Sequence, residues 1–251
     1  TLPESDSCAV EKIRGSHASP QCHHHSFQVA ASRTVTMNSE PQDPKPSDSK
    51  EISQIRGGQT LIVVDKEDNF LEYATRTACH LDRRLCHRAV VLFIYNDQEE
   101  ILLQKRNNEL FDGLWDLAGA THPLHSEGRD ESYEESVVRC LKDEWRISSP
   151  MTRVLSFTYF ESDGDLCENE YCALFAGKYN DRLDPNPDHV NEFKWVTWSE
   201  LQSELEEKPQ QFTPWLKVAV DLLERNVFHS EGEIEQNFAQ WATLKQSLRP
   251  S

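Results

Sequence analysis

Two glutamates separated by one residue are the clearest chemical signal in the sequence. Glu168 and Glu170 lie near the beginning of a segment predicted to form a β-strand, and residues i and i+2 of a strand point to the same face. Like charges on one face repel each other unless a cation or a basic group compensates them. The pair therefore predicts a bound metal ion.

Three histidines are candidates for the remaining ligands. His80 and His87 precede the predicted central strand, and His122 lies in the loop that contains Gly119. Three imidazoles with two carboxylates suit Zn, Mn or Fe(II), whereas Mg prefers oxygen ligands and phosphate. Each histidine alone is weak evidence, because single histidines are more often surface or hydrogen-bonded core residues. The sequence alone does not bring the five side chains together.

The elements that must position these side chains are predicted from apolar periodicity and turn residues. Strands are predicted at 60–65, 89–95, 101–106, 154–160, 170–176 and 191–196, with the second and third joined as a hairpin. Two helices are predicted to begin near Ser199 and Pro214. A helix at 132–145 is predicted from apolar residues at helical spacing, which are Val137, Val138, Leu141 and Trp145. This order of elements predicts a mixed α/β sandwich.

The composition restricts the kind of partner. The chain has 251 residues and a formal net charge of -17, which argues against nucleic acid or an anionic membrane as a partner. Its apolar runs are too short to span a bilayer. Seven cysteines without CxxC spacing predict free thiols in a reducing compartment. We expect a cytoplasmic protein that is a monomer or a weak dimer, with organellar targeting by the N-terminal region left open.

One domain, at 59–228, accounts for most of the chain. Residues 1–58 are rich in Ser, Pro, Gln, His and charge and lack apolar periodicity. Such a segment cannot offset the entropy lost on ordering, so a disordered tail is predicted. Residues 229–251 are predicted to form a C-terminal helix or tail.

Six segments carry a resemblance to a known family. In chain order they are Cys79-His80-Leu81, His87-Arg88-Ala89, Leu102-Leu103-Gln104-Lys105-Arg106, His122-Pro123-Leu124, Glu168 to Ala176, and Thr213-Pro214-Trp215. In this order they resemble type I isopentenyl diphosphate isomerases, a branch of the Nudix superfamily. Several such motifs in the same order are hard to obtain by chance. The resemblance implies a Nudix-type α/β fold, in which a mixed β-sheet sandwich has flanking helices.

Metal binding is the first property that the resemblance implies. It assigns one divalent transition metal, Mn, Zn or Fe, to the ligands His80, His87, His122, Glu168 and Glu170. Glu144 resembles the helix glutamate that helps to hold Mg against the substrate diphosphate. Arg76 and Arg106 match basic residues that contact the phosphates.

The implied substrate is a prenyl diphosphate, whose double bond moves by protonation and then deprotonation. Glu170 resembles the proton donor, Tyr159 the assisting phenol, and Trp215 the indole that faces the carbocation through its π cloud. The base does not match, because Ala120 stands where the family has its catalytic thiol. Asp116, in the same loop, is the candidate substitute, and capping of a turn is its alternative role.

Other positions depart from the family as well. Cys140 stands where the family's helix usually has Arg, and the loop at 107–112 is shorter than in the family and lacks its Lys. Cys79, Cys86 and Cys167 each precede a predicted ligand, so on an extended chain they point away from the metal. Both the base and the diphosphate contacts are therefore altered.

Three functions remain open from the sequence. The family default is a metal-dependent isomerase of isoprenoid metabolism that interconverts isopentenyl and dimethylallyl diphosphate. A divergent enzyme that cyclises or hydrolyses a prenyl diphosphate fits an acid without its thiol partner. A non-catalytic protein that binds metal or prenyl diphosphate fits the loss of the base. The retained ligands favour an enzyme.

Overall fold

The computed structural model describes residues 33–35, 58–228 and 233–247. Most of the tail predicted at 1–58 lies outside these residues. Arg33–Val35, however, forms a short strand, β1, that pairs antiparallel with β12 (Val190–Thr197). The edge of a sheet offers unpaired backbone groups to any extended segment, whatever its composition. This part of the predicted tail therefore joins the sheet.

The predicted strands are all present, with five further strands among them. The structure contains β2 (Thr60–Val64), β3 (Phe70–Thr75), β4 (His87–Tyr95), β5 (Glu100–Arg106), β6 (Trp115–Asp116), β7 (Gly119–Thr121), β8 (Leu124–Ser126), β9 (Arg129–Asp130), β10 (Thr152–Asp163) and β11 (Leu166–Lys178). Strands β6 to β9 are too short to give a periodic signal. β3 gives none because Ala74 is its one buried residue.

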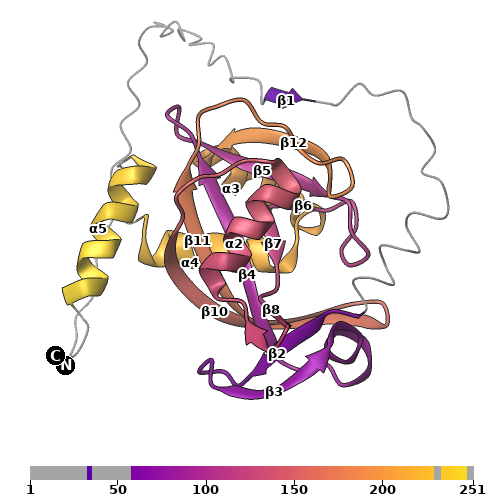
Figure 1. Cartoon of the computed structure of the whole chain (residues 1–251). Helices are drawn as coiled ribbons and strands as arrows, with labels where there is room; N and C mark the ends of the chain where they lie inside the picture. The colour runs from indigo at the N-terminus through magenta and orange to yellow at the C-terminus, as the bar shows by residue number, and fades with distance from the viewer. Residues whose placement is uncertain (1–32, 36–57, 229–232, 248–251) are drawn as a thin grey trace, which may run out of the picture. The chain divides into compact units, whose positions relative to one another are not determined.

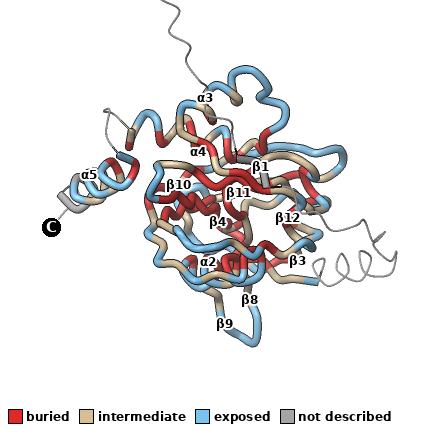
Figure 2. The backbone as a smooth tube through the Cα atoms, turned by 90° about the horizontal axis from the view of Figure 1, so that it is seen from above, coloured by how far each residue is buried: buried red, intermediate tan, exposed pale blue. Residues whose placement is uncertain are grey.

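β4 is buried on both faces, which explains its continuous apolar run. Val90 and Leu92 pack on one side with residues of α2 (Tyr133–Cys140). Val91 and Phe93 alternate to the other side, where they pack with α4 (Pro214–Asn226). In Figure 1 α2 lies in front of the sheet and α4 behind it. Figure 2 shows the buried strands β4 and β11 between α2 on one side and α3 (Trp198–Glu207) and α4 on the other.

The predicted hairpin of β4 and β5 is present as a tight connection but not as a ladder. The two strands pair only at Tyr95 and Ile101 and then separate. β4 continues parallel to β11, whereas β5 continues antiparallel to β12. The segment at 115–121 fills the space between them, because β6 pairs with β5 and β7 pairs with β4. This loop is therefore held between two central strands.

The predicted helix at 132–145 begins as α2 and ends in a π-helical turn, η2 (Leu141–Trp145). Ser132 and Glu135 form a capping box at its N-terminus. Arg146 ends it in the left-handed region, with φ of 53°. The prediction that Val138 lies on the apolar face is wrong, since Val138 is 61% exposed.

The C-terminal region extends the core. It contains α3, the 3-10 turn η3 (Pro209–Gln211), α4 and α5 (Ile234–Ser247). The rings of Phe238 and Phe93 lie 5.5 Å apart, and the Trp241 indole donates a hydrogen bond of 3.0 Å to the carbonyl of Val154. α5 thus packs on the same core as β4 and β10. Within the described residues, no helix is long and apolar enough to cross a membrane.

The contribution of α5 can be measured. Phe238→Ala should lower the free energy of unfolding by about 2 kcal/mol, because the ring contacts Phe93, Tyr95 and Phe228. Gln240→Ala, at an exposed position of the same helix, should change it by less than about 0.5 kcal/mol. Urea unfolding measures both variants. Equal stability of the two would show that α5 adds nothing to the core.

Candidate metal site and substrate pocket

The sheet register places three site residues in one row. Glu170 on β11 lies beside His87 on β4 and beside Tyr159 on β10. Glu168 projects to the same face as Glu170, two residues earlier on the strand. His80 comes from a π-helical turn, η1 (Ala78–Asp82), that contacts β11. His122 directly follows β7.

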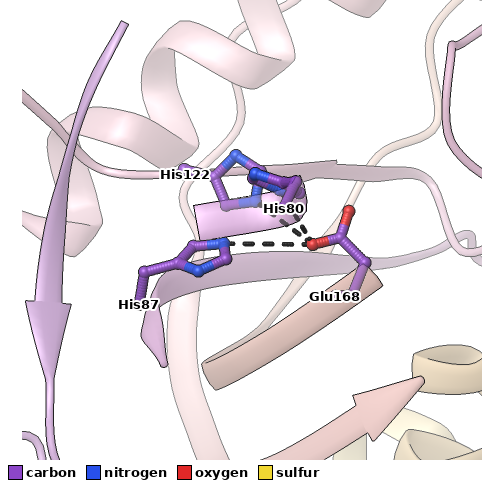
Figure 3. Close-up of side chains that lie close together, drawn as sticks. All are labelled: His80, His87, His122 and Glu168. Carbon is purple, nitrogen blue, oxygen red and sulfur yellow. Dashed lines mark ion pairs between the residues drawn. The ribbon is translucent and has the colours of Figure 1, made fainter. Parts of the chain in front are cut away.

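Four of these side chains form a buried cluster. Ligand atoms of His80, His87, His122 and Glu168 all lie within 4.8 Å of one another. Figure 3 shows the three imidazole rings turned toward the Glu168 carboxylate. Glu170 lies beside them, with its Oε1 atom 2.9 Å from His122 Nε2 and 3.9 Å from His87 Nε2. The fold therefore brings together the five residues that are far apart in the sequence.

The hydrogen bonds of the cluster leave lone pairs that face one another. The Nδ1 atoms of His80 and His87 lie 2.8 Å from the backbone carbonyls of Arg76 and Leu85. A carbonyl only accepts, so both Nδ1 atoms carry the proton and both Nε2 atoms present a lone pair. His80 Nε2 lies 3.0 Å from Glu168 Oε2, yet neither atom has a hydrogen-bond partner. A divalent cation between them would satisfy both, so this donor set fits a metal.

Burial and neighbouring charges set the protonation states. Burial lowers the pKa of His87 well below its usual value and that of His122 to about 4, so both imidazoles are neutral. Burial acts to raise the pKa of Glu168, but the adjacent His80 and His122 hold it well below the usual range. Neutral imidazoles and an ionised carboxylate are the forms that bind metal.

The pKa of Glu170 is shifted in the direction opposite to that of Glu168. Burial, and then the charge of Glu168, raise the pKa of Glu170 well above its usual value. The Tyr159 hydroxyl lies 2.6 Å from its Oε2 atom, and His122 Nε2 lies 2.9 Å from its Oε1 atom. The pair of glutamates thus combines an ionised group with a group that retains its proton, which is a common arrangement for acid catalysis.

A pocket of about 290 Å³ opens beside Glu170. Its apolar part includes Val90, Val91, Ala120, Cys172 and Trp215, and its cationic side chains are Arg76, Arg106 and Arg139. Glu144, Asp143 and Asp188 also line it. An apolar region next to a group of arginines suits a ligand with a hydrocarbon part and an anionic part.

The chain is similar in sequence to known proteins. A family model described as NUDIX domain matches residues 86–216. Isopentenyl-diphosphate Delta-isomerase 2 of Aromatoleum aromaticum is 30% identical over 64% of this chain and 84% of its own length. Isopentenyl-diphosphate delta-isomerase of Schizosaccharomyces pombe is 31% identical over 72% of this chain and 87% of its own length. This chain belongs to the isopentenyl-diphosphate isomerase branch of the Nudix family.

A solved structure supports the fold of this family member. DR0079 from Deinococcus radiodurans superposes with a TM-score of 0.52 at 18% identity, covering 66% of this chain and 98% of its own. The predicted Nudix-type fold, a mixed sheet with flanking helices, is confirmed.

Glu144 lies on the η2 turn and lines the pocket. Its Oε2 atom accepts a hydrogen bond of 3.0 Å from Gln104, and the Cys140 thiol donates to its Oε1 atom at 3.4 Å. A Cβ at position 119 would lie 2.8 Å from Cys140 Sγ and 3.1 Å from Glu144 Oε2. Gly119 therefore allows the loop to approach this carboxyl group.

Asp116 departs from the role expected for it. It is fully buried and is absent from the residues that line the pocket. Its Oδ1 atom accepts from Thr213 and from the Trp215 indole at 2.7 Å, and Oδ2 accepts from Arg106 at 2.9 Å. A carboxylate with these partners, away from the pocket, is placed to hold Arg106 and Trp215 rather than to take a proton from substrate. The geometry therefore gives no support to Asp116 as a substitute base.

Arg139, Cys172 and His189 are among the pocket residues that sequence reasoning missed. Arg139 lies on the helix α2, and its Nη2 atom donates a hydrogen bond of 2.8 Å to the His122 carbonyl. Cys172 follows Glu170 by two residues, so strand alternation alone was a signal for it. His189 comes from a loop and gave no signal. Cys79, Cys86 and Cys167 do not line the pocket, as expected, and the five cysteines of the described residues are free thiols.

Removal of a predicted ligand tests the metal site. Glu168→Gln and His87→Asn should each weaken divalent metal binding at least about tenfold, because each removes a buried donor aimed at the cluster. His125→Asn is the control, since His125 bonds Asp130 outside the cluster. Elemental analysis after equilibrium dialysis against Mn or Zn measures the loss. Full metal content in both ligand variants would rule out this site.

In metal-free protein, Glu144 should make the free energy of unfolding depend on pH. Burial raises the pKa of Glu144 from 4.5 to about 7, so the folded state binds its proton more tightly than the unfolded state does. The stability that the Glu144 proton contributes to the folded state is fully present below the pKa of 4.5 that Glu144 has in the unfolded state. It is lost as the pH rises through the pKa of about 7 that Glu144 has in the folded state. Wild type should therefore lose up to about 1.4 kcal/mol per pH unit in this window relative to Glu144→Gln. Urea unfolding at several pH values measures this, and parallel profiles would contradict it.

Proposed function

We propose that this protein is a metal-dependent enzyme of isoprenoid metabolism that protonates the alkene of a prenyl diphosphate. The environment of Glu170 carries the proposal. Its carboxyl group is buried, has a raised pKa and is adjacent to Tyr159 and to the pocket. A carboxyl group that keeps its proton at neutral pH is a suitable general acid. The similarity to isopentenyl-diphosphate isomerases supports the substrate class.

The acid is held in place by its neighbours. Since Oε1 of Glu170 is 2.9 Å from the His122 ring, the acidic proton would lie on Oε2, next to the Tyr159 hydroxyl. A divalent metal on the histidines and Glu168 would balance the Glu168 charge and fix the orientation of Glu170. The proton would pass from Glu170 to the alkene carbon.

The anionic end of the substrate would lie against the arginines. Arg76 and Arg139 line the pocket near His122. Arg106 already donates hydrogen bonds to Asp116 and to the carbonyl of Leu110, so part of its guanidinium is occupied. Glu144 would hold Mg²⁺ against the diphosphate. Arginine suits phosphate because its planar fork forms two parallel hydrogen bonds.

Aromatic groups would stabilise the resulting carbocation. The Tyr159 and Trp215 ring centroids lie 6.0 Å apart at the pocket. The guanidinium of Arg106 lies 4.8 Å from the centroid of the Trp215 ring, so this indole already interacts with positive charge. The hydrogen bond from the indole to Asp116 fixes the ring.

The missing base distinguishes this protein from an ordinary isomerase. Ala120 pairs with Val91 and lines the pocket, where a methyl group cannot accept a proton. Burial raises the pKa of the pocket thiols Cys140 and Cys172 well above the usual value, so neither is a ready thiolate. We infer that isopentenyl isomerisation is slow and that the carbocation is quenched by another route, such as cyclisation or water.

Deuterium incorporation tests the protonation step directly. Wild-type protein incubated in D₂O with prenyl diphosphates of about five to about twenty carbons should place deuterium on one of them. Glu170→Gln should reduce this at least about a hundredfold, because the amide has no acidic proton. Glu161→Gln, an exposed position on β10 opposite Glu168, should have little effect. Mass spectrometry of the recovered substrate and product provides the measurement.

The other outcomes separate the competing functions. Ala120→Cys should increase isopentenyl to dimethylallyl conversion above the wild-type level, since it places a thiol in the pocket that Glu170 also lines. Phosphate release without deuterium incorporation would identify a hydrolase and overturn the proposal. Substrate binding with neither reaction would identify a non-catalytic binding protein.

A further inference from the structure

Arg76 contacts two of the three clustered histidines in opposite ways. Its backbone carbonyl lies 2.8 Å from His80 Nδ1, and its side-chain Nη1 lies 2.8 Å from His122 Nδ1. The carbonyl can only accept a hydrogen bond, and the guanidinium can only donate one. His80 therefore carries its proton on Nδ1, whereas His122 has its Nδ1 lone pair engaged by Arg76.

The contact with Arg76 determines the tautomer of His122. A neutral imidazole has one N–H, so when Nδ1 accepts, the proton must lie on Nε2. That N–H points to Glu170 Oε1 at 2.9 Å. In this state His122 Nε2 has no lone pair for a metal, although it lies 3.9 Å from Glu168 Oε2 within the cluster. His80 and His87 already present theirs.

Arg76 also lines the pocket that would receive the diphosphate. An anion there competes with His122 for the guanidinium, because an arginine–phosphate contact joins opposite charges and is bidentate, whereas Arg76 donates to the neutral imidazole through Nη1 alone. When Arg76 leaves, nothing holds the Nδ1 lone pair of His122. The proton can then move from Nε2 to Nδ1, which leaves the number of protons on the ring unchanged.

We propose that Arg76 is a positioning residue that couples occupancy of the anion pocket to metal binding by His122. Diphosphate draws Arg76 away, His122 changes tautomer, and its Nε2 lone pair becomes available to the metal. The same change removes the hydrogen bond that His122 donates to Oε1 of Glu170. Anion and metal then bind with positive cooperativity, since each favours the same arrangement of His122. This inference rests on the metal and diphosphate binding proposed above.

The tautomer of His122 can be observed without turnover. In protein with ¹⁵N-labelled histidine, long-range ¹H–¹⁵N NMR spectra distinguish the two tautomers, and His122→Asn assigns the signal. We expect the Nε2-protonated form in metal-free wild type, where Glu170 accepts that N–H, and in wild type with Zn²⁺ alone. Zn²⁺ together with inorganic pyrophosphate should give the Nδ1-protonated, metal-bound form, and Arg76→Met should give that form with Zn²⁺ alone. An Nδ1-protonated His122 in metal-free wild type, or the same tautomer in wild type and Arg76→Met with Zn²⁺ alone, would overturn the proposal.

Metal affinity gives a second measurement. Arg76→Met should bind Mn²⁺ about tenfold more tightly than wild type, because the charge-assisted hydrogen bond that opposes coordination is gone. Arg139→Met is the matched control: it also removes a pocket cation near His122, but Arg139 contacts the backbone carbonyl and not the ring. An equal gain in both variants would show a general effect of charge and refute the coupling. Absence of catalytic turnover alters neither measurement, so failure of the proposed reaction would be recognised separately.

Discussion

Two carboxylates on one face of a buried strand are the constraint around which this site is arranged. Glu168 and Glu170 cannot both be ionised there without compensation. The fold surrounds Glu168 with His80 and His122, which hold it ionised, and places Glu170 beside Tyr159, where its pKa is raised. One residue type at two neighbouring positions thus acquires two chemical roles, because the partners supplied by β4, β10 and η1 differ.

The separation of β4 from β5 lets the segment at 115–121 pair with both strands. If the two strands formed a continuous ladder, the segment at 115–121 would have no sheet edge to join. Their divergence lets β6 and β7 enter and places Ala120 over the pocket. Asp116, at the same point, joins Arg106 on β5 to Thr213 and Trp215 at the beginning of α4. A residue that looked catalytic in the sequence instead connects the sheet to the helix that carries the indole.

The pocket contains the proposed acid, Glu170, and has Ala120 at the position where the resemblance to the isomerases implies a thiol. The acid, its phenol and the indole converge on the same cavity, whereas position 120 supplies only a methyl group. The three pocket arginines differ in the contacts they already make. Arg106 forms an ion pair with Asp116, Arg139 forms one with Glu131, and Arg76 contacts the His122 ring. Reaction at this site would therefore depend on how the anion rearranges these contacts as well as on the groups present.

The sequence by itself determined the long strands, the helix at 132–145 and the five candidate ligands, because periodicity and ordered motifs are local signals. It did not show that β4 and β5 separate, that Val138 faces solvent, or that Cys172 and Arg139 reach the pocket. The roles of Asp116 and Arg76 were also decided only by tertiary structure. Arg76 and His122 are 46 residues apart in the chain, and the tautomer of the ring depends on a contact that exists only after folding. Protonation and hydrogen-bond direction are properties of an environment, which no local pattern of residues encodes.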